Sequence, residues 1–215
     1  MARCLCFNMR KRIKKKQYVD PEKHLTEKQV PAIKKYLDKK AAQVRPSRAW
    51  RALTNRAIFD FMVNTGLRAE ELINVRMRDL PYCHGKDVVN VRRGKGDVAR
   101  MVVISPALAK RIKEYVKRCR KSAKPNSYLF VNEDGGQLSY RSLYSKLQRI
   151  GLASGVGRLT PHMLRHTYAM YWYAKADKDV LGLQDQLGHR DTETTHIYAR
   201  TTATERAKWA AICDR

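Results

Sequence analysis

Apolar residues recur at three- and four-residue steps over most of the chain, which is the spacing of one face of an α-helix. Trp50, Leu53, Ala57 and Phe61 show this spacing, and Gly66 follows them as a natural helix stop. The pattern therefore predicts a helix over 47–65. Similar spacing predicts further helices over 69–75, 107–121, 139–150, 161–175, 178–187 and 203–212.

A capping sequence marks the start of the first helix. Thr26 can act as an N-cap with Gln29 three residues later, and Leu25 and Val30 occupy the positions of a hydrophobic staple. We therefore expect the first helix to begin after Thr26.

One part of the chain has a strand-like pattern instead. Val88–Val91 and Met101–Ile104 are rich in β-branched residues and flank a segment that contains Gly94-Lys95-Gly96. This arrangement predicts an antiparallel hairpin with Lys95 near its tip. The run Tyr128–Asn132 fits either an extra strand or a core segment. The predicted fold class is mainly α with a small antiparallel β-sheet, that is, α+β.

The charge balance narrows the classes of partner. The 215 residues include 45 Lys and Arg against 20 Asp and Glu, which gives a net charge of +25. Such a charge favours polyanions, meaning nucleic acid or an anionic membrane surface. Hydrophobic residues make up 43% of the chain, which argues against wholesale disorder. The apolar runs are far shorter than the ~18 residues of a membrane-spanning helix. Five irregularly spaced cysteines favour reduced thiols in a cytoplasmic protein.

The positive charge is concentrated near the N-terminus. Residues 1–19 contain seven basic side chains and no acidic one. We predict a basic N-terminal tail over 1–24, followed by one domain over 25–215. The alternative is a solvated surface that only keeps the protein in solution. The size of the local excess favours phosphate contacts, and the residues assigned to them in the tail are Arg10, Lys11, Arg12, Lys14, Lys15 and Lys16.

Four separate segments carry candidate chemistry. Arg68 stands just before a predicted helix, and His162 and Arg165 share one face at the start of another, which Thr160 can cap. Helix N-termini favour bound anions. With Lys95, His189 and Tyr198, these side chains are the groups that a metal-free phosphodiester transfer needs. No metal or cofactor is expected.

The order Arg68, Lys95, His162-x-x-Arg165, Gly188-His189, Tyr198 resembles the tyrosine recombinase (phage integrase) family, over about residues 25–212. Two secondary features match as well: Glu71 lies three residues after Arg68, and Arg100 lies five residues after Lys95. The resemblance implies the family's catalytic-domain fold. It also implies a site-specific recombinase that cuts and rejoins DNA in integration, excision or inversion.

The resemblance also implies a role for each matched residue. Tyr198 attacks a DNA phosphate and forms a 3′-phosphotyrosyl bond, and Lys95 protonates the 5′-oxygen leaving group. Arg68 and Arg165 hold the non-bridging oxygens, since a guanidinium is planar and always charged. The two remaining matched groups, His162 and His189, donate hydrogen bonds and help to move the proton of the nucleophile. Glu71 is expected to orient the arginines, and Arg100 is assigned to DNA.

Less specific interpretations remain for each residue. Arg68 could be a surface partner of Glu71, Lys95 a solvated turn residue and His189 a helix cap, while His166 is assigned mainly to structure. Tyr198 competes with ten other tyrosines, and its spacing of nine residues from His189 favours it. Three of its competitors share a helix and fit the core or an interface better, and these are Tyr168, Tyr171 and Tyr173.

The expected partners are double-stranded DNA and further copies of the chain, as a tetramer on two DNA sites, with an accessory DNA-bending protein. The expected location is the cytoplasm, at the nucleoid. At most about 24 residues precede the first helix, too few for the separate DNA-clamping domain of most family members. The C-terminal segment 199–215 could dock on a neighbouring copy or on its own domain.

Three other functions remain open. The chain could be a catalytically weak accessory DNA-binding protein of the same fold, although binding alone does not require Tyr198 or Lys95. It could be a type IB topoisomerase, which uses the same nicking chemistry without exchanging partners. A basic RNA-binding protein is the third, and no aromatic stacking motif of that kind is visible.

Overall fold

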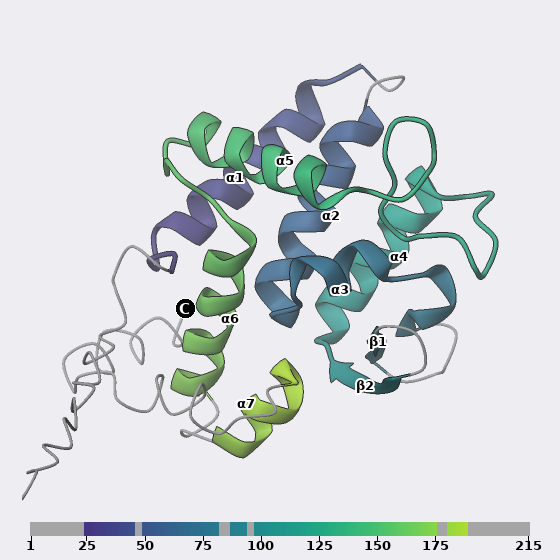
Figure 1. Ribbon diagram of the computed structural model, residues 1–215. Helices are drawn as coiled ribbons and strands as arrows, with labels where there is room; N and C mark the ends of the chain where they lie inside the picture. The colour runs from purple at the N-terminus through teal and green to yellow at the C-terminus, as the bar shows by residue number, and fades with distance from the viewer. Residues whose placement is uncertain (1–23, 46–48, 82–86, 94–96, 176–179, 189–215) are drawn as a thin grey trace, which may run out of the picture.

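The computed structural model describes residues 24–45, 49–81, 87–93, 97–175 and 180–188. Helices dominate this part of the chain, and one two-stranded sheet lies at the edge (Figure 1). The elements in chain order are α1 (Gln29–Gln43), α2 (Ala49–Thr65), α3 (Ala69–Asn74), the short 3-10 helix η3 (Met77–Asp79), β1 (Val88–Arg93), β2 (Asp97–Val103), α4 (Pro106–Cys119), α5 (Tyr140–Ala153), α6 (Pro161–Lys175) and α7 (Val180–Leu187).

The predicted fold class is confirmed, and so is the hairpin. β1 and β2 pair antiparallel with Val89 opposite Val102 and Val91 opposite Arg100, and the register shifts between Val91 and Arg93. The tip at 94–96, with Lys95, lies outside the described residues. The helix predicted over 203–212 lies outside them too.

The predicted capping is confirmed at α6 and only in part at α1. The Gln29 side chain reaches back, and its Oε1 accepts from the Thr26 amide at 2.8 Å, so α1 begins at Gln29 after one turn. Thr160 Oγ1 accepts from the Met163 amide at 3.2 Å, and Pro161 is the first residue of α6. The Thr160 contact satisfies an amide that a helix start leaves without a partner. At α1 the N-cap is Lys28 and not the predicted Thr26.

Helix α2 lies at the centre of the main core and contacts α1, α4 and α6. Its residues Ile58, Phe59, Phe61 and Met62 are fully buried. The Phe61 ring meets the Phe130 ring edge-to-face, with 5.8 Å between centroids. The run at 128–132 is therefore a core segment. Among the described residues its strand-like pairing consists of isolated bridges, between Tyr128 and Arg76 and between Val131 and Gln137.

A second, smaller apolar cluster joins α6 to α7. Its buried members are Tyr168, Ala169, Met170, Tyr173, Leu183 and Leu187. The prediction that the tyrosines of α6 belong to the core is confirmed for Tyr168 and Tyr173. Helix α7 lies between α6 and the hairpin and contacts both (Figure 1). In the part of the chain that the structure describes, no helix is long and apolar enough to cross a membrane.

Candidate functional site

Arg68 lies at the junction between α2 and α3. Helix α2 ends at Thr65, and the next residue, Gly66, has a φ of +63°, a left-handed conformation that suits glycine. The chain then turns, and Arg68 becomes the N-cap of α3. Its amide donates to Glu71 Oε2 at 2.8 Å, and its Nη1 donates to Glu71 Oε1 at 3.1 Å. The Arg68 side chain remains 36% exposed, so it pairs with Glu71 and also faces solvent.

Glu71 is a buried carboxylate held by two arginines. Arg100 of β2 donates to it through both terminal nitrogens, from Nη1 to Oε1 at 2.7 Å and from Nη2 to Oε2 at 2.9 Å. Burial alone would raise the pKa of Glu71, but the hydrogen bonds and charge of Arg100, together with the Arg68 amide and guanidinium, outweigh it. The pKa is therefore lowered to about 2. Glu71 is ionised at neutral pH and fixes both guanidiniums.

Arg165 lies on α6 and is nearly buried, with 7% of the residue exposed. Its Nη1 donates to the Gly66 carbonyl at 2.6 Å, and its Nη2 donates to the Leu187 carbonyl at 3.0 Å. The guanidinium thus links the end of α2 to the end of α7. Such a link requires the fork of donors that arginine has and lysine lacks.

Three guanidiniums meet at the C-terminal end of α7. Arg100 donates to the carbonyl of Gln186 at 3.0 Å, Arg165 to that of Leu187, and Arg68 to that of Gly188 at 3.4 Å. A helix leaves its last carbonyls without partners, and its C-terminus carries a partial negative charge. The end of α7 therefore organises a cluster of positive charge from three separate elements.

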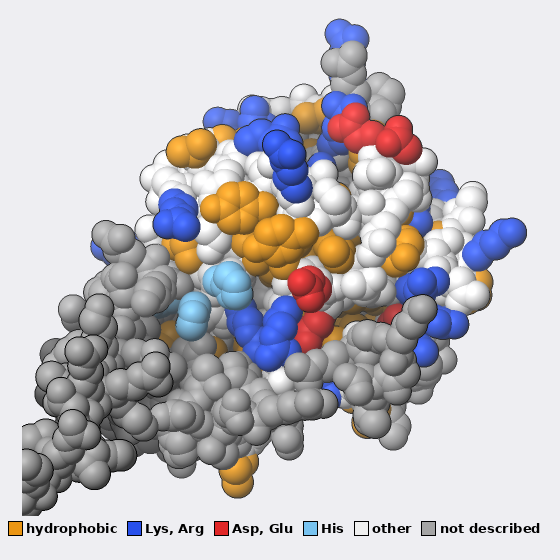
Figure 2. All heavy atoms as spheres, in the orientation of Figure 1, with side chains coloured by type: hydrophobic (Ala, Val, Ile, Leu, Met, Phe, Trp, Pro, Cys, Tyr) orange, Lys and Arg blue, Asp and Glu red, His pale blue; other side chains and the backbone are white. Residues whose placement is uncertain are grey.

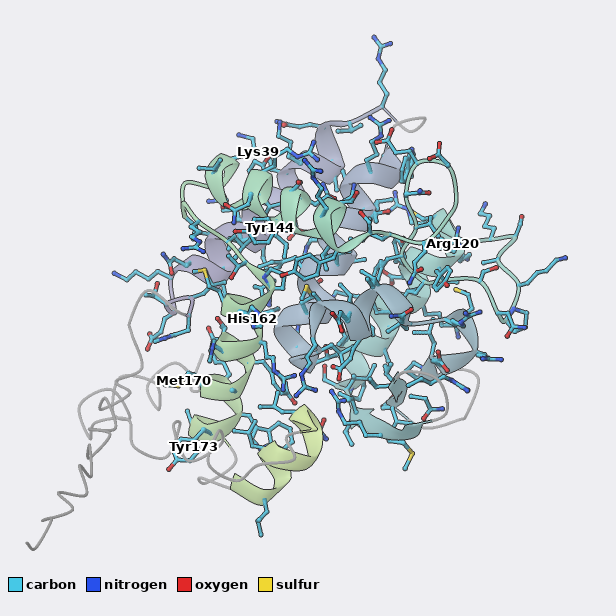
Figure 3. All side chains as sticks on the ribbon, in the orientation of Figure 1. Lys39, Arg120, Tyr144, His162, Met170 and Tyr173 are labelled. Carbon is cyan, nitrogen blue, oxygen red and sulfur yellow. The ribbon has the colours of Figure 1, made fainter. Side chains whose placement is uncertain are left out.

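His162 lies in the first turn of α6 and is exposed, below Tyr144 of α5 in Figure 3. His166 follows one turn later and is half-buried. Figure 2 shows histidine side chains beside Lys and Arg side chains, with acidic side chains on the other side of the basic group. This face combines hydrogen-bond donors, fixed cations and a carboxylate that orients them.

The structure brings together four of the predicted residues: Arg68, Glu71 and Arg100 are directly bonded, and Arg165 reaches the same helix end. Two more predicted residues, His162 and His166, share α6 with Arg165. Gly188 ends α7 with a φ of +63°, immediately before His189 in the sequence. Three site predictions, Lys95, His189 and Tyr198, and the six basic residues assigned to the tail lie outside the described residues.

The site also uses partners that the sequence analysis did not name. These are the backbone carbonyls of Gly66, Gln186, Leu187 and Gly188, which anchor the arginines. Every residue has a carbonyl, so side-chain chemistry gives no signal for them. The available signal was indirect, since Gly66 was recognised as a helix stop.

This arrangement suits an anionic ligand with several oxygens. Guanidiniums bind phosphate oxygens through paired hydrogen bonds, and fixed cations stabilise charge that develops during phosphoryl transfer. Within the described ranges, no group of three or more His, Cys, Asp and Glu side chains could hold a metal ion.

The chain matches a known family over most of its length. The sequence model described as "Phage integrase family" matches residues 23–205. Tyrosine recombinase XerC of Nitrobacter winogradskyi is 32% identical over 168 residues, which cover 78% of this chain and 52% of that protein. Tyrosine recombinase XerA of Pyrococcus furiosus is 34% identical over 184 residues, covering 84% of this chain and 58% of that protein.

A solved structure agrees with these matches. The crystal structure of the XerH site-specific recombinase bound to its difH substrate, a pre-cleavage complex, superposes with a TM-score of 0.68 and 27% identity. The match covers 86% of this chain and 52% of that one. The chain therefore spans about half the length of the curated relatives that it matches.

Proposed function

Because this chain belongs to the phage integrase family, we propose that it is a site-specific tyrosine recombinase that cuts and rejoins DNA through a 3′-phosphotyrosyl intermediate. The observation that carries the proposal is the arginine cluster at the end of α7. Arg68 and Arg165 come from different helices, and both are anchored to carbonyls that immediately precede His189. This geometry supports a phosphate site bounded by these arginines.

The described residues divide the work of binding a phosphodiester. Arg68, which is partly exposed and held by Glu71, binds a non-bridging oxygen, and Arg165 supplies the second guanidinium from α6. His162, exposed in the first turn of α6, donates a further hydrogen bond. Positioning and charge stabilisation account for most of the catalysis of phosphoryl transfer, so fixed cations suit this chemistry.

The remaining roles are proposed from the family motif. Tyr198 is the nucleophile, Lys95 the general acid, and His189 assists proton transfer. An ordinary tyrosine has a pKa near 10, so attack at neutral pH needs a cationic setting. A 5′-hydroxyl from another strand then displaces Tyr198 and reseals the DNA. The covalent bond conserves the energy of the phosphodiester, so ATP is not needed.

The proposed partners are double-stranded DNA and other copies of the chain, four of which assemble on two duplexes with an accessory DNA-bending protein. The proposed location is the cytoplasm, at the nucleoid. The proposed organisation is a basic tail over 1–24 and a catalytic domain over 25–215. Exchange between two labelled duplexes tests the assembly, because a type IB topoisomerase relaxes DNA without exchanging partners.

Trapping the covalent intermediate tests the proposal. The purified chain is incubated with a pool of random-sequence duplexes that carry nicks, so that a short released strand diffuses away and cannot religate. We expect a protein–DNA band on a denaturing gel from the wild type. Tyr198→Phe should bind DNA with unchanged affinity and form no such band.

Tyr173→Phe is the matched control, since it removes a hydroxyl from a buried core tyrosine of α6. It should form the covalent band as the wild type does. A band that persists in Tyr198→Phe would exclude Tyr198 as the nucleophile. Binding by the wild type without any covalent band would favour the accessory DNA-binding protein.

A further inference from the structure

Arg100 makes contacts that a surface residue facing DNA does not need. Each of its three side-chain nitrogens has a partner within the protein: both terminal nitrogens donate to Glu71, and Nε donates to the Gln186 carbonyl. The side chain is only 18% exposed. The two parallel bonds to Glu71 form a bidentate pair, which is the most directional contact that arginine makes.

Gly188 fits closely against this guanidinium. A Cβ atom at Gly188 would lie 2.8 Å from Arg100 Nη1, closer than real Cβ atoms approach, and 3.0 Å from Cδ and Cζ, so the Arg100 side chain would have to shift. The φ of +63° at Gly188 also disfavours any residue with a side chain. Glycine is therefore needed here for two reasons, the backbone turn and the contact with Arg100.

These contacts join three parts of the site. Arg100 belongs to β2, which in the sequence follows Gly94-Lys95-Gly96 directly. Glu71 belongs to α3 and holds Arg68. The carbonyl of Gln186 belongs to the end of α7, two residues before Gly188. Helix α7 shares its apolar cluster with α6. Arg100 of β2 and Arg68 at the start of α3 both donate to carbonyls at its C-terminal end.

We infer that Arg100 is a positioning residue of the proposed recombination site, one that holds the end of α7 and the Arg68–Glu71 pair against the hairpin and does not itself bind DNA. The inference rests on the proposed function, because what Arg100 positions is the proposed phosphate-binding group. It differs from the DNA contact assigned to Arg100 from the sequence, because both terminal nitrogens of Arg100 are paired with the carboxylate of Glu71.

Arg100→Ala separates the two roles. If Arg100 is a positioning residue, Arg100→Ala should slow covalent complex formation at saturating DNA by about 10²-fold, because a misplacement of about 1 Å at a reacting centre lowers the rate by that order. DNA affinity and its salt dependence should stay unchanged. If Arg100 contacts a phosphate instead, the slope of log affinity against log salt falls by about 0.9. A reduced slope with a normal rate at saturating DNA would overturn the inference.

Arg92→Ala is the matched control on the same hairpin. Arg92 lies on β1, its side chain is 54% exposed, and it pairs with Asp79 at 3.1 Å, away from Glu71. It should form the covalent complex at the wild-type rate at saturating DNA. A loss equal to that of Arg100→Ala would mean that any change in the hairpin has this effect, and the inference would fail.

Gly188→Ala disturbs the same contact without removing a charge. It should reproduce the slow rate of Arg100→Ala. The double variant should be no slower than either single variant, because both changes break the same contact. If the double variant is slower than either single variant, by the product of the two single defects in rate, the two changes act on separate contacts and the inference is contradicted.

Gly155→Ala is the control for the effect of a side chain on a left-handed backbone, since Gly155 has a φ of +76° and a Cβ there meets nothing within 4 Å. This variant should form the covalent complex at the wild-type rate.

Hydrogen exchange of the free protein provides a test that does not depend on catalysis. Without Arg100, the amides of residues 181–187 should exchange at least about ten-fold faster, because α7 loses a charge-assisted hydrogen bond and opens more often. The amides of α4 should be unchanged. Unchanged exchange in α7 would overturn the inference even if the wild type forms no covalent complex, so its failure is distinct from failure of the proposed function.

Discussion

Glu71 connects the charged groups of the site at the scale of single residues. It is buried, and it bonds both Arg68 and Arg100. Burying a carboxylate costs several kcal/mol unless its oxygens are paired and hydrogen-bonded. Each carboxylate oxygen of Glu71 accepts one hydrogen bond from the Arg100 guanidinium. Oε1 also accepts from the Arg68 guanidinium, and Oε2 also accepts from the Arg68 amide. The carboxylate thereby sets the distance between two side chains that come from different elements.

This coupling predicts a pH dependence of stability. The pKa of Glu71 is about 2 in the folded chain against an ordinary 4.5, so ionised Glu71 stabilises the fold above pH 4.5, and this contribution is lost as the pH falls toward 2. Lowering the pKa by that much corresponds to about 3 kcal/mol. Between pH 6 and pH 3 the wild type should lose about 2 kcal/mol more unfolding free energy than Glu71→Gln.

Denaturant unfolding of both proteins across this range measures the difference. The free energies of unfolding of the two proteins should converge toward low pH, where Glu71 also becomes neutral. Parallel curves would mean that the Glu71 carboxylate carries no such stabilisation.

Lys95 provides a second prediction at this scale. Its proposed role is to protonate the 5′-oxygen as it leaves, and a general acid contributes typically about 10²–10⁴-fold. Lys95→Ala should slow cleavage by that order and leave binding nearly intact. Replacing the bridging 5′-oxygen with sulfur gives a thiolate leaving group that needs no proton, so this substrate should restore cleavage by Lys95→Ala.

The sulfur substrate should not rescue Tyr198→Phe, whose missing function is attack. If sulfur leaves the Lys95→Ala defect as large as before, Lys95 holds the phosphate or the structure. The acid would then be His162 or His189.

The sequence predicted the side chains of the site better than their partners. Arg68 and Glu71 were recognisable because their three-residue spacing and opposite charge identify a local pair. Arg100 was assigned to DNA through the family resemblance, on its spacing of five residues from Lys95. Its bonds to Glu71 and Gln186 depend on how β2 meets α3 and α7, and no local pattern encodes that meeting.

At the scale of elements, the ends of helices position the site. Helices α2 and α7 are each followed by a glycine with a φ of +63°, Gly66 and Gly188. The carbonyl of Gly66 accepts from Arg165, and that of Gly188 accepts from Arg68. A glycine stop turns the backbone sharply and leaves its carbonyl available. The same residues therefore end the helices and anchor the two proposed phosphate-binding arginines.

Gly66→Ala should be strongly destabilising. The added Cβ would fall into the Tyr168 ring and lie 2.8 Å from Leu187 Cδ2, in addition to the cost of the left-handed backbone. We expect a loss of about 3 kcal/mol or more, whereas Gly155→Ala, with open space around its Cβ, should lose about 1–2 kcal/mol.

Thermal unfolding measures both variants, at about 2–4 °C per kcal/mol for a domain of this size. Equal changes in Tm would show that backbone strain alone decides the cost and that the contact between Gly66 and Tyr168 adds nothing.

Helices were more predictable than the short apolar runs. The helical periodicity of 47–65 predicted α2, and the capping sequences at Thr26 and Thr160 predicted the starts of α1 and α6 to within about three residues, although the N-cap of α1 is Lys28. The run at 128–132 was ambiguous because five apolar and polar residues fit a strand or a buried segment equally well. Its burial against Phe61 and Tyr115 decides the matter, and that packing is tertiary.

At the scale of the whole molecule, charge is the dominant property. The net charge of +25 is unevenly distributed: residues 1–56 contain 17 basic and 4 acidic side chains. A concentrated positive field attracts a polyanion from a distance and raises the rate of association, and salt screens it. The arginine cluster at α7 is fixed by protein partners, so it is suited to chemistry at one phosphate more than to general affinity for DNA.

The N-terminal tail should therefore supply much of the non-specific affinity for DNA. Deleting residues 2–16 removes seven basic side chains and none of the proposed catalytic residues. Each phosphate contact that is lost should lower the slope of log affinity against log salt by about 0.9, equally on every DNA sequence. The rate of covalent complex formation at saturating DNA should not change, because the tail contributes binding and the arginine cluster contributes chemistry. Fluorescence anisotropy at several salt concentrations measures the slope, and an unchanged slope after the deletion would assign the tail to solubility alone.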